Sequence, residues 1–289
     1  MIREKGKIPR LASALAVLAL AAAAGWAFLA FLANPQWHWR LYAWRAGENG
    51  RLDPPPGYSG DWRHWDQSGR LLSLYRYREG RRDGPYQTFD SAGLPLSRGQ
   101  YEAGLLEGIQ IINQESGART EAPYRRGKRE GVERTWFDNG RLAVESPWVD
   151  GVQEGSVVFY FEDGSLQASI PFYRGRIEGV QKAWHANGRL QAEETFRNGL
   201  KNGPSRFWRD DGGLDMELNY FDDKMDGTQT WFHPNGGKAR EINLLQGIPQ
   251  GSWKEWDENG SLVVDEEYDK GELKRGEGRA SRPAGGAPE

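Results

Sequence analysis

The chain has 289 residues, with 38 glycines, 13 tryptophans and no cysteine. The lack of cysteine excludes disulfides, a thiolate nucleophile and Cys-ligated zinc or iron–sulfur sites. The net charge of −3 comes from 38 basic and 41 acidic residues and argues against nucleic acid as a partner, because phosphates require a concentrated basic surface.

The N-terminal region predicts a single transmembrane helix. Residues 1–10 are basic, and residues 11–33 contain no charged side chain. A helix of that length spans about 34 Å, enough to cross a bilayer core. Positive charge before the apolar run favours a cytoplasmic N-terminus, so we expect a signal-anchor in the cell inner membrane and the rest of the chain on the periplasmic or extracytoplasmic side.

A cleaved signal peptide is the alternative. Small residues at Ala22 and Ala24 would permit cleavage after Ala24 and secretion to the periplasm. Residues 34–59 then form a juxtamembrane aromatic segment and a stiff linker that contains Pro54, Pro55 and Pro56.

Residues 60–275 form nine repeats of about 24 residues. One glycine marks each repeat, and the register is held by Gly60, Gly84, Gly108, Gly131, Gly155, Gly179, Gly203, Gly227 and Gly251. An aromatic residue follows five positions later in all but one repeat, as in Trp136 and Trp184, and a second aromatic column includes Trp148 and Phe196. Residues 276–289 lack core residues and predict a disordered tail.

Each repeat predicts a β-hairpin. Pairs such as Asn139-Gly140 and Asn187-Gly188 favour a type I′ or related turn, and the second connection, as in Arg174-Gly175, predicts a looser turn. Side chains alternate between faces along a strand, so we expect Leu142, Val144, Ser146 and Trp148 on one face. The aromatic columns should therefore lie on one face, with a row of acids on the other.

The pattern aromatic-x-x-Asn-Gly-x-Leu, then aromatic-x-x-Gly-x-x-x-Gly, resembles the bacterial variant of the MORN repeat. Proteins with that variant are often grouped as YwqK-type antitoxins. The resemblance covers residues 60 to about 275 and is best at 136–155 and 184–203. It implies protein or membrane binding, with toxin neutralisation for the bacterial variant, and it brings no catalytic residue.

The fold class that we predict is all-β: an elongated single-layer antiparallel sheet of stacked β-hairpin (MORN-like) repeats, preceded by one N-terminal transmembrane helix. Two sets of side chains are candidates for partner binding. The first is a row of acids that would meet a basic partner such as a toxin, or would simply be a solvated face: Glu145, Glu193, Glu217, Glu241 and Asp265. The second comprises less regular aromatics on the face opposite to the aromatic columns: Trp62, Trp231, Trp253, Phe159 and Phe207.

A second column of acids just before the repeat glycine is attributed to turn chemistry, as in Glu107, Glu130, Glu154, Glu178 and Asp226. His185 and His233 are two repeats apart, roughly 19 Å, too far to share a metal. We expect no enzyme activity, no cofactor and no metal.

The predicted function is that of a membrane-anchored, non-catalytic repeat protein that binds a partner protein, with a toxin-neutralising (immunity or antitoxin-like) protein as its sharpest version. The alternative is a cell-envelope scaffold that binds glycan, lipid or envelope proteins. The oligomeric state is left open.

Overall fold

The computed structural model describes residues 54–66 and 68–278, and every regular element in them is a β-strand. Within these residues no helix is long and apolar enough to cross a membrane. The predicted basic N-terminus, the predicted membrane helix over residues 11–33, most of the predicted linker and residues 279–289 of the predicted tail lie outside the described residues.

The described chain divides into two compact units at Leu94. The first unit holds β1 (Gly60–Trp65), β2 (Leu71–Arg78) and β3 (Arg81–Phe89), which pair antiparallel in chain order. Tyr75 on β2 stacks on Tyr86 of β3 with the ring centroids 5.3 Å apart. Cross-strand aromatic contacts of this kind stabilise a small sheet.

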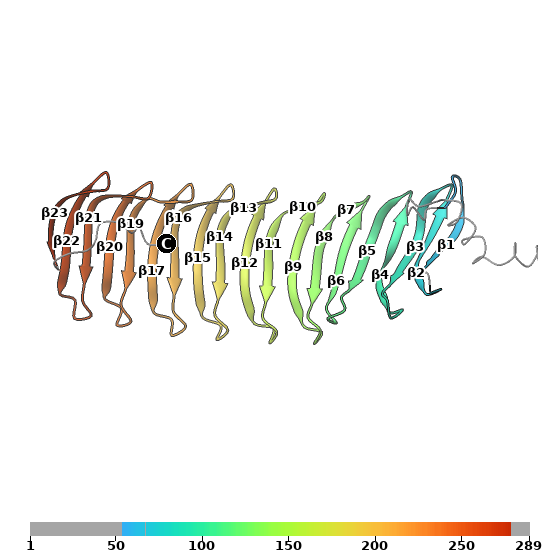
Figure 1. Cartoon of the computed structure of the whole chain (residues 1–289), viewed down its shortest axis with the longest axis horizontal. Coiled ribbons are helices and arrows are strands. Elements are labelled where there is room, and N and C mark those ends of the chain that lie inside the picture. Colours follow the sequence, from blue (N-terminus) through green and yellow to red (C-terminus); the bar gives the residue numbers. More distant parts are fainter. Residues whose placement is uncertain (1–53, 67, 279–289) are drawn as a thin grey trace, which may run out of the picture. The chain divides into compact units, whose positions relative to one another are not determined.

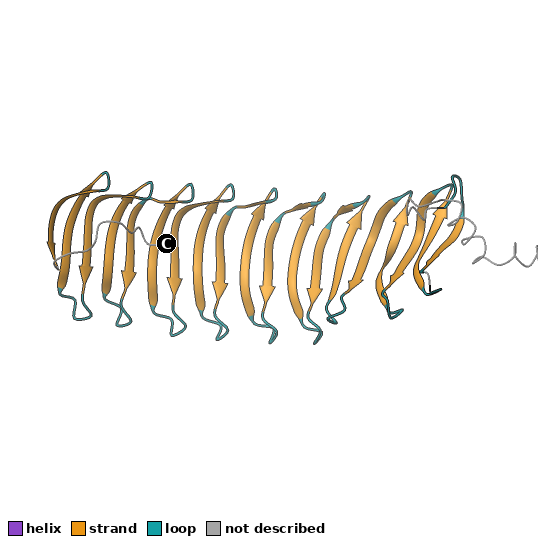
Figure 2. Cartoon of the chain, viewed as in Figure 1, coloured by secondary structure: helices purple, strands orange, loops and turns teal. Residues whose placement is uncertain are grey.

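The second unit is a longer antiparallel sheet in which neighbours in the chain are neighbours in space (Figures 1 and 2). Its strands are β4 (Pro95–Glu102), β5 (Leu105–Asn113), β6 (Arg119–Arg125), β7 (Lys128–Arg129), β8 (Gly131–Trp136), β9 (Leu142–Val149), β10 (Val152–Gln153), β11 (Gly155–Tyr160), β12 (Leu166–Tyr173), β13 (Arg176–Ile177), β14 (Gly179–Trp184), β15 (Leu190–Arg197), β16 (Leu200–Trp208), β17 (Leu214–Phe221), β18 (Lys224–Met225), β19 (Gly227–Phe232), β20 (Lys238–Leu245), β21 (Ile248–Trp256), β22 (Leu262–Asp269) and β23 (Glu272–Gly278). The predicted antiparallel array of hairpins is confirmed within each unit. β23 extends to Gly278, so the first residues that we assigned to the tail belong to a strand.

The tight type I′ turn occurs at the second connection of each repeat, where the sequence predicted a looser turn. Val149 pairs with Val152, which leaves Asp150 and Gly151 as the turn, at φ of 52° and 83°. Positive φ at both central residues defines type I′. That part of the turn prediction was wrong.

The Asn-Gly connection is instead a three-residue loop. In the loop after β8 only Gly140 has a positive φ, and the amide of Phe137 donates to the carbonyl of Arg141 at 2.8 Å. The Asn139 side chain accepts from the amide of Arg141 at 2.9 Å. This arrangement is a type I turn followed by a left-handed glycine.

A β-bulge at the loop end of most hairpins, though not of β5–β6, reverses the faces of the sheet. Trp136 pairs with Leu142 and Thr135 pairs with Val144, so Ala143 has no partner. Leu142 therefore lies on the opposite face from Val144, Ser146 and Trp148, and the prediction that all four share a face was wrong.

We call one face of the second unit the charged face, after its ion pairs, and the other the hollow face, after the depression that opens on it. The charged face holds Glu145, its partner Arg134 and, two residues along β8, Trp136. The hollow face holds Ser146 and Phe159. The first aromatic column therefore shares a face with the acids, contrary to the prediction. The hydrogen bond from the Tyr160 hydroxyl to Glu145 Oε2 at 3.2 Å places both side chains on the charged face.

Most of the core of the second unit follows one row along the hollow face. It includes Val157, Leu218 and Ile242, together with Ser205 and Gln229, which are 0% exposed. The Gln229 amide accepts from the amide of Asn219 at 2.9 Å and donates to the carbonyls of Asn219 and Gly227. These bonds satisfy a polar side chain that would otherwise be costly to bury.

A ladder of hydrogen bonds joins successive repeats at the type I′ turns. The carboxylate of Glu154 accepts from the amide of Arg174 at 2.7 Å, and the amide of Gly175 donates to the carbonyl of Gln153 at 2.9 Å. The second acidic column repeats this contact at Glu107, Glu130, Glu178 and Asp226. Its predicted role in turn chemistry is confirmed.

Candidate partner-binding surfaces

The predicted acidic row lies on the charged face, and each acid has a base beside it, on the same strand for Glu241 and on a neighbouring strand for the others. Glu145 binds Arg134 at 2.9 Å, Glu193 binds Lys182 at 2.9 Å and Glu217 binds Arg206 at 2.7 Å. Glu241 forms an ion pair with Lys238, and Asp265 is the cross-strand partner of Lys254. The row therefore contains bases as well as acids.

Two of the five acids also face a base on the strand on their other side. Glu193 also pairs in register with Arg206, and Glu241 pairs with Lys254. Opposite charges in neighbouring strands attract one another and lower the field that the row projects into solvent. The row is thus a weaker attractor for a basic partner than the acids alone suggest.

Tyr160 extends this network on the charged face. Burial and, second, the nearby Glu145 carboxylate raise the pKa of Tyr160 above its ordinary value of 10.0. The hydroxyl therefore stays protonated at neutral pH and donates its proton to Glu145.

Four of the five aromatic candidates lie on the hollow face of the second unit. Phe159, Phe207 and Trp231 occupy one row, which runs across the strands by direct pairing. Trp253 lies in the neighbouring row, and the Arg240 guanidinium lies 5.6 Å from the Trp231 ring and 6.0 Å from the Trp253 ring. The structure thus brings Trp231 and Trp253 together around one cation.

Trp62 lies in the first unit. Its ring packs edge-on against Tyr58, with centroids 5.4 Å apart, and its backbone pairs with Tyr75. Trp62 therefore belongs to the packing of that unit.

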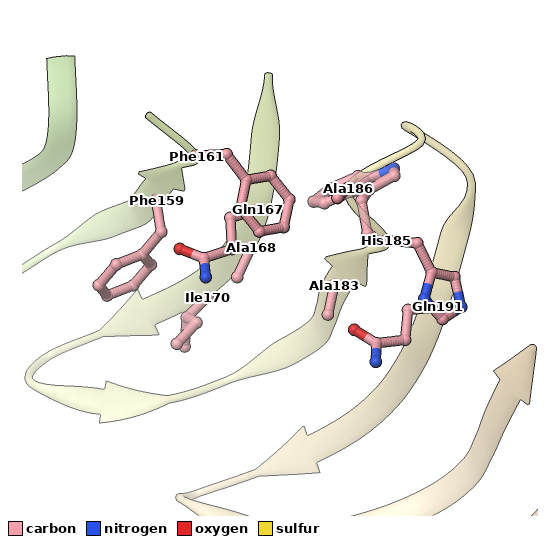
Figure 3. A pocket seen from close by; sticks show the side chains of 10 residues that line it. Phe159, Phe161, Gln167, Ala168, Ile170, Ala183, His185, Ala186 and Gln191 are labelled. Atoms are coloured by element: carbon pink, nitrogen blue, oxygen red, sulfur yellow. The ribbon is translucent and has the colours of Figure 1, made fainter. Parts of the chain in front are cut away.

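A hollow of about 600 Å³ opens on the hollow face beside Phe159. Three alanines separate Phe159 from Phe207 in its row, namely Ala168, Ala183 and Ala192, and the first two line the hollow. Figure 3 shows the rings of Phe159 and Phe161 on one side and His185 and Gln191 on the other, with Ala168 and Ala183 between them. Small side chains beside large ones leave the depression open.

The lining of the hollow contains one histidine, His185. Its polar groups are the amides of Gln167 and Gln191, which stand at the unpaired bulge positions of β12 and β15. No Asp, Glu, Lys or Arg is among the residues that line it. Such a surface suits a neutral, partly apolar group with a few hydrogen-bonding atoms.

The hollow was not found from the sequence, although a signal exists. Four positions after the repeat glycine, three successive repeats carry Phe159, Ala183 and Phe207. A small residue between two aromatic residues at the same position of successive repeats predicts a gap. The face on which the gap opens follows only when the position of the β-bulge is known.

The two histidines noted in the sequence support neighbouring repeats. His185 Nε2 lies 2.8 Å from the carbonyl of Trp208, and His233 Nε2 lies 2.9 Å from the carbonyl of Trp256. Over residues 54–66 and 68–278, no group of three His, Cys, Asp or Glu side chains could hold a metal ion.

Solved structures that are similar to this chain are much larger. The TcdB2–TccC3–Cdc42 complex matches with 12% identity over 72% of this chain and 14% of that chain, at a TM-score of 0.16. The Tc holotoxin pore of Photorhabdus luminescens matches with 12% identity over 72% of this chain and 15% of that chain, at a TM-score of 0.17. This chain therefore spans about one seventh of the chains that it matches, and such TM-scores support no argument about fold or function.

No curated protein matches this chain. The family described as MORN repeat variant matches residues 177–198, 225–245 and 249–270. Each matched stretch covers most of one hairpin: β14–β15, β19–β20 and β21–β22. Three hairpins of the chain are therefore repeats of the MORN variant, and the resemblance to MORN repeats is confirmed at that level.

Proposed function

We propose that this chain is a membrane-anchored, non-catalytic repeat protein that captures a partner protein on its hollow face, and that the partner is a toxin which the chain neutralises. One observation supports this proposal above the others. The hollow beside Phe159 is a depression on a regular sheet with no Asp, Glu, Lys or Arg in its lining, while acids of the opposite face already pair with bases. A protruding apolar side chain of the partner, flanked by backbone groups that reach Gln167 or Gln191, would fill it.

Site-specific photo-crosslinking tests which face binds. A benzophenone side chain at Phe161 lines the hollow, and the same group at Val180 projects from the charged face at a position 44% exposed. We expect one discrete protein adduct from position 161 in cells, and none from position 180. Equal labelling from both positions would contradict the proposal.

A variant that fills the hollow should lose partner binding, and a variant on the other face is its control. Ala183→Trp places a large ring on the floor of the hollow, and Thr228→Trp adds a similar ring on the charged face. We expect the adduct at position 161 to disappear in the first variant and to remain in the second. Each variant is also expressed with a toxin encoded beside the gene. Ala183→Trp should abolish protection of the cells, and Thr228→Trp should preserve it.

A neutral glycan also fits an uncharged hollow with aromatic rings and amide groups. Suppose that isolated peptidoglycan pulls down the chain, that Ala183→Trp abolishes this binding, and that no protein adduct forms. That result would assign the hollow to an envelope scaffold instead.

Membrane anchoring is tested separately. Deleting residues 1–33 should release the array from inner membranes, and the N-terminal sequence of the mature chain decides between an anchor and cleavage after Ala24.

A further inference from the structure

One exposed row on the charged face contains apolar and basic residues and no acid over six consecutive repeats. The two residues that flank each type I′ turn pair with one another, and we call the following six pairs the turn stripe: Arg125–Lys128, Val149–Val152, Tyr173–Arg176, Arg197–Leu200, Phe221–Lys224 and Leu245–Ile248. Val149 lies four residues beyond Glu145 along β9, so the stripe shares the charged face.

The stripe is accessible along its whole length. Every residue in it is exposed, and its apolar side chains range from 40% for Leu200 to 56% for Leu245. Turns one repeat apart are roughly 10 Å apart, so six turns extend over about 50 Å. An exposed row of that length, with an apolar side chain in five of its six pairs, is typical of a contact surface.

The stripe also carries positive charge, and most of its cations form no ion pair in the described part of the chain. Its cations are Arg125, Lys128, Arg176, Arg197 and Lys224. Only Lys128 forms an ion pair among residues 54–66 and 68–278, with Asp150 at 3.6 Å, and both side chains are mostly exposed. Such a pair contributes little, so the stripe attracts an anionic partner.

The charge of the residues in this row changes from positive to negative beyond both ends of the stripe. The pair before Arg125–Lys128 is Glu102–Leu105, and the pair after Leu245–Ile248 is Asp269–Glu272. These acids delimit the stripe and would disfavour an anionic partner that extended beyond it.

The row of acids on the charged face, two rows from the stripe, limits the width of the surface that the stripe attracts. Glu145, Glu193 and Glu217 lie about 13 Å from the stripe along their strands. A broad anionic surface, such as a bilayer, would extend over these acids, which already pair with bases, and would gain no attraction there. A narrow chain segment would contact the stripe alone.

We propose that the turn stripe binds one extended segment of a partner protein. In that segment an acidic residue and an apolar residue each recur every three positions. Three extended residues span about 10 Å, which matches the distance between successive turns. Acids of the segment pair with the unpaired arginines, while its apolar residues cover Val152, Leu200 and Phe221. This surface lies on the opposite face from the hollow, so the proposal does not depend on the proposed function.

A designed peptide tests the stripe directly. The probe is a fluorescent 18-residue peptide that repeats Glu-Leu-Ser, and its control repeats Lys-Leu-Ser. Anisotropy is measured against the full chain in nanodiscs of neutral lipid, at low and high salt. We expect saturable binding of the acidic peptide that weakens with salt, and no binding of the basic peptide.

Matched variants locate the binding. Arg176→Glu reverses one charge of the stripe, and Arg98→Glu reverses an exposed arginine on the charged face outside it. We expect about tenfold weaker binding in the first variant and unchanged affinity in the second. The double variant Val152→Ser/Leu200→Ser should weaken binding without changing its salt dependence, and near-UV circular dichroism checks that each variant is folded.

Two results would overturn the proposal. One is equal affinity of the acidic peptide for the Arg176→Glu and Arg98→Glu chains. The other is tight binding of phosphatidylglycerol vesicles, but not of phosphatidylcholine vesicles or the acidic peptide, that is lost in Arg176→Glu. That second result would assign the stripe to an anionic membrane surface. Neither result bears on crosslinking at Phe161.

Discussion

Asp163 is held in its ionised form by the loop that contains it. The Ser165 hydroxyl donates to Asp163 Oδ1 at 2.5 Å, and the Ser165 amide donates to the same atom at 2.8 Å. These two bonds hold the pKa of Asp163 below its ordinary value of 3.8, and the hydroxyl contributes most. Because the folded-state pKa is lowered, the stabilisation is present above pH 3.8 and is lost as the pH falls through the folded-state pKa.

Replacing Ser165 by Ala should therefore raise the pKa of Asp163. Nuclear magnetic resonance titration of the Asp163 side chain measures this directly. Ser156→Ala is the control, since Ser156 is an exposed serine at the start of β11, away from that loop. An unchanged pKa in Ser165→Ala would mean that the hydroxyl does not hold the carboxylate.

Asn187 links its own loop to the next repeat. Its Oδ1 accepts from the amide of Arg189 at 3.0 Å, and its Nδ2 donates to the carbonyl of Asp210 at 2.7 Å. Asn187→Asp keeps the acceptor and removes the donor, so we expect a loss of about 1 kcal/mol in the free energy of unfolding. Urea denaturation measures it.

Asn259→Asp is the matched control for that change. Asn259 occupies the equivalent loop position, and its side chain forms no bond to another repeat within the described residues. The control should therefore leave the unfolding midpoint nearly unchanged. Equal losses in both variants would show that the effect arises within the loop and not between repeats.

At the scale of the element, the type I′ turn at Asn198-Gly199 depends on glycine for conformational reasons alone. Gly199 has a φ of 85°, and a Cβ built on it would meet no atom within 4 Å. Gly199→Ala should therefore destabilise the protein by about 1–2 kcal/mol through backbone strain without any clash. Gly199→Asn should cost less, because asparagine tolerates the left-handed region. Equal costs for the two variants in urea denaturation would contradict this explanation.

The hairpins were predictable because their determinants are chemical and recur at fixed spacing. The identity of the tight turn was not, because its first central residue varies among Glu79, Ala103, Arg126 and Asp150, all at φ near 50°. None of these residue types except Asp favours that conformation. The turns are supported from outside, as when Glu130 accepts from the amide of Asp150.

The reversal of faces was unpredictable for a similar reason. The unpaired bulge position is Ala143 in one hairpin, Gln167 in the next and Asp215 further along, so no side chain marks it. The acidic row was found from the sequence, but its compensation was missed. The signal was present, because Arg134 precedes Glu145 by the same 11 residues that separate Lys182 from Glu193.

At the scale of the whole molecule, the second unit is held by contacts between neighbours. Each strand pairs with the strands next to it, and the side-chain links from Asn187 and Glu178 reach only the following repeat. Stability in such an array is a sum of repeat terms and nearest-neighbour terms. The length of the unit is then adjustable in steps of one repeat.

Deleting residues 156–179 tests this directly, because it joins Gly155 to Val180 and keeps every column in register. We expect the shortened chain to retain its β-sheet circular dichroism and to unfold cooperatively. The dependence of its unfolding free energy on urea should decrease in proportion to the residues removed, since less surface is exposed on unfolding.

Deleting residues 156–167 instead removes half a hairpin, so β9 would be followed by a strand of the wrong register and the wrong face. That chain should lose cooperative unfolding. If both deletions were equally damaging, the coupling would extend beyond nearest neighbours, and the one-dimensional description of the array would fail.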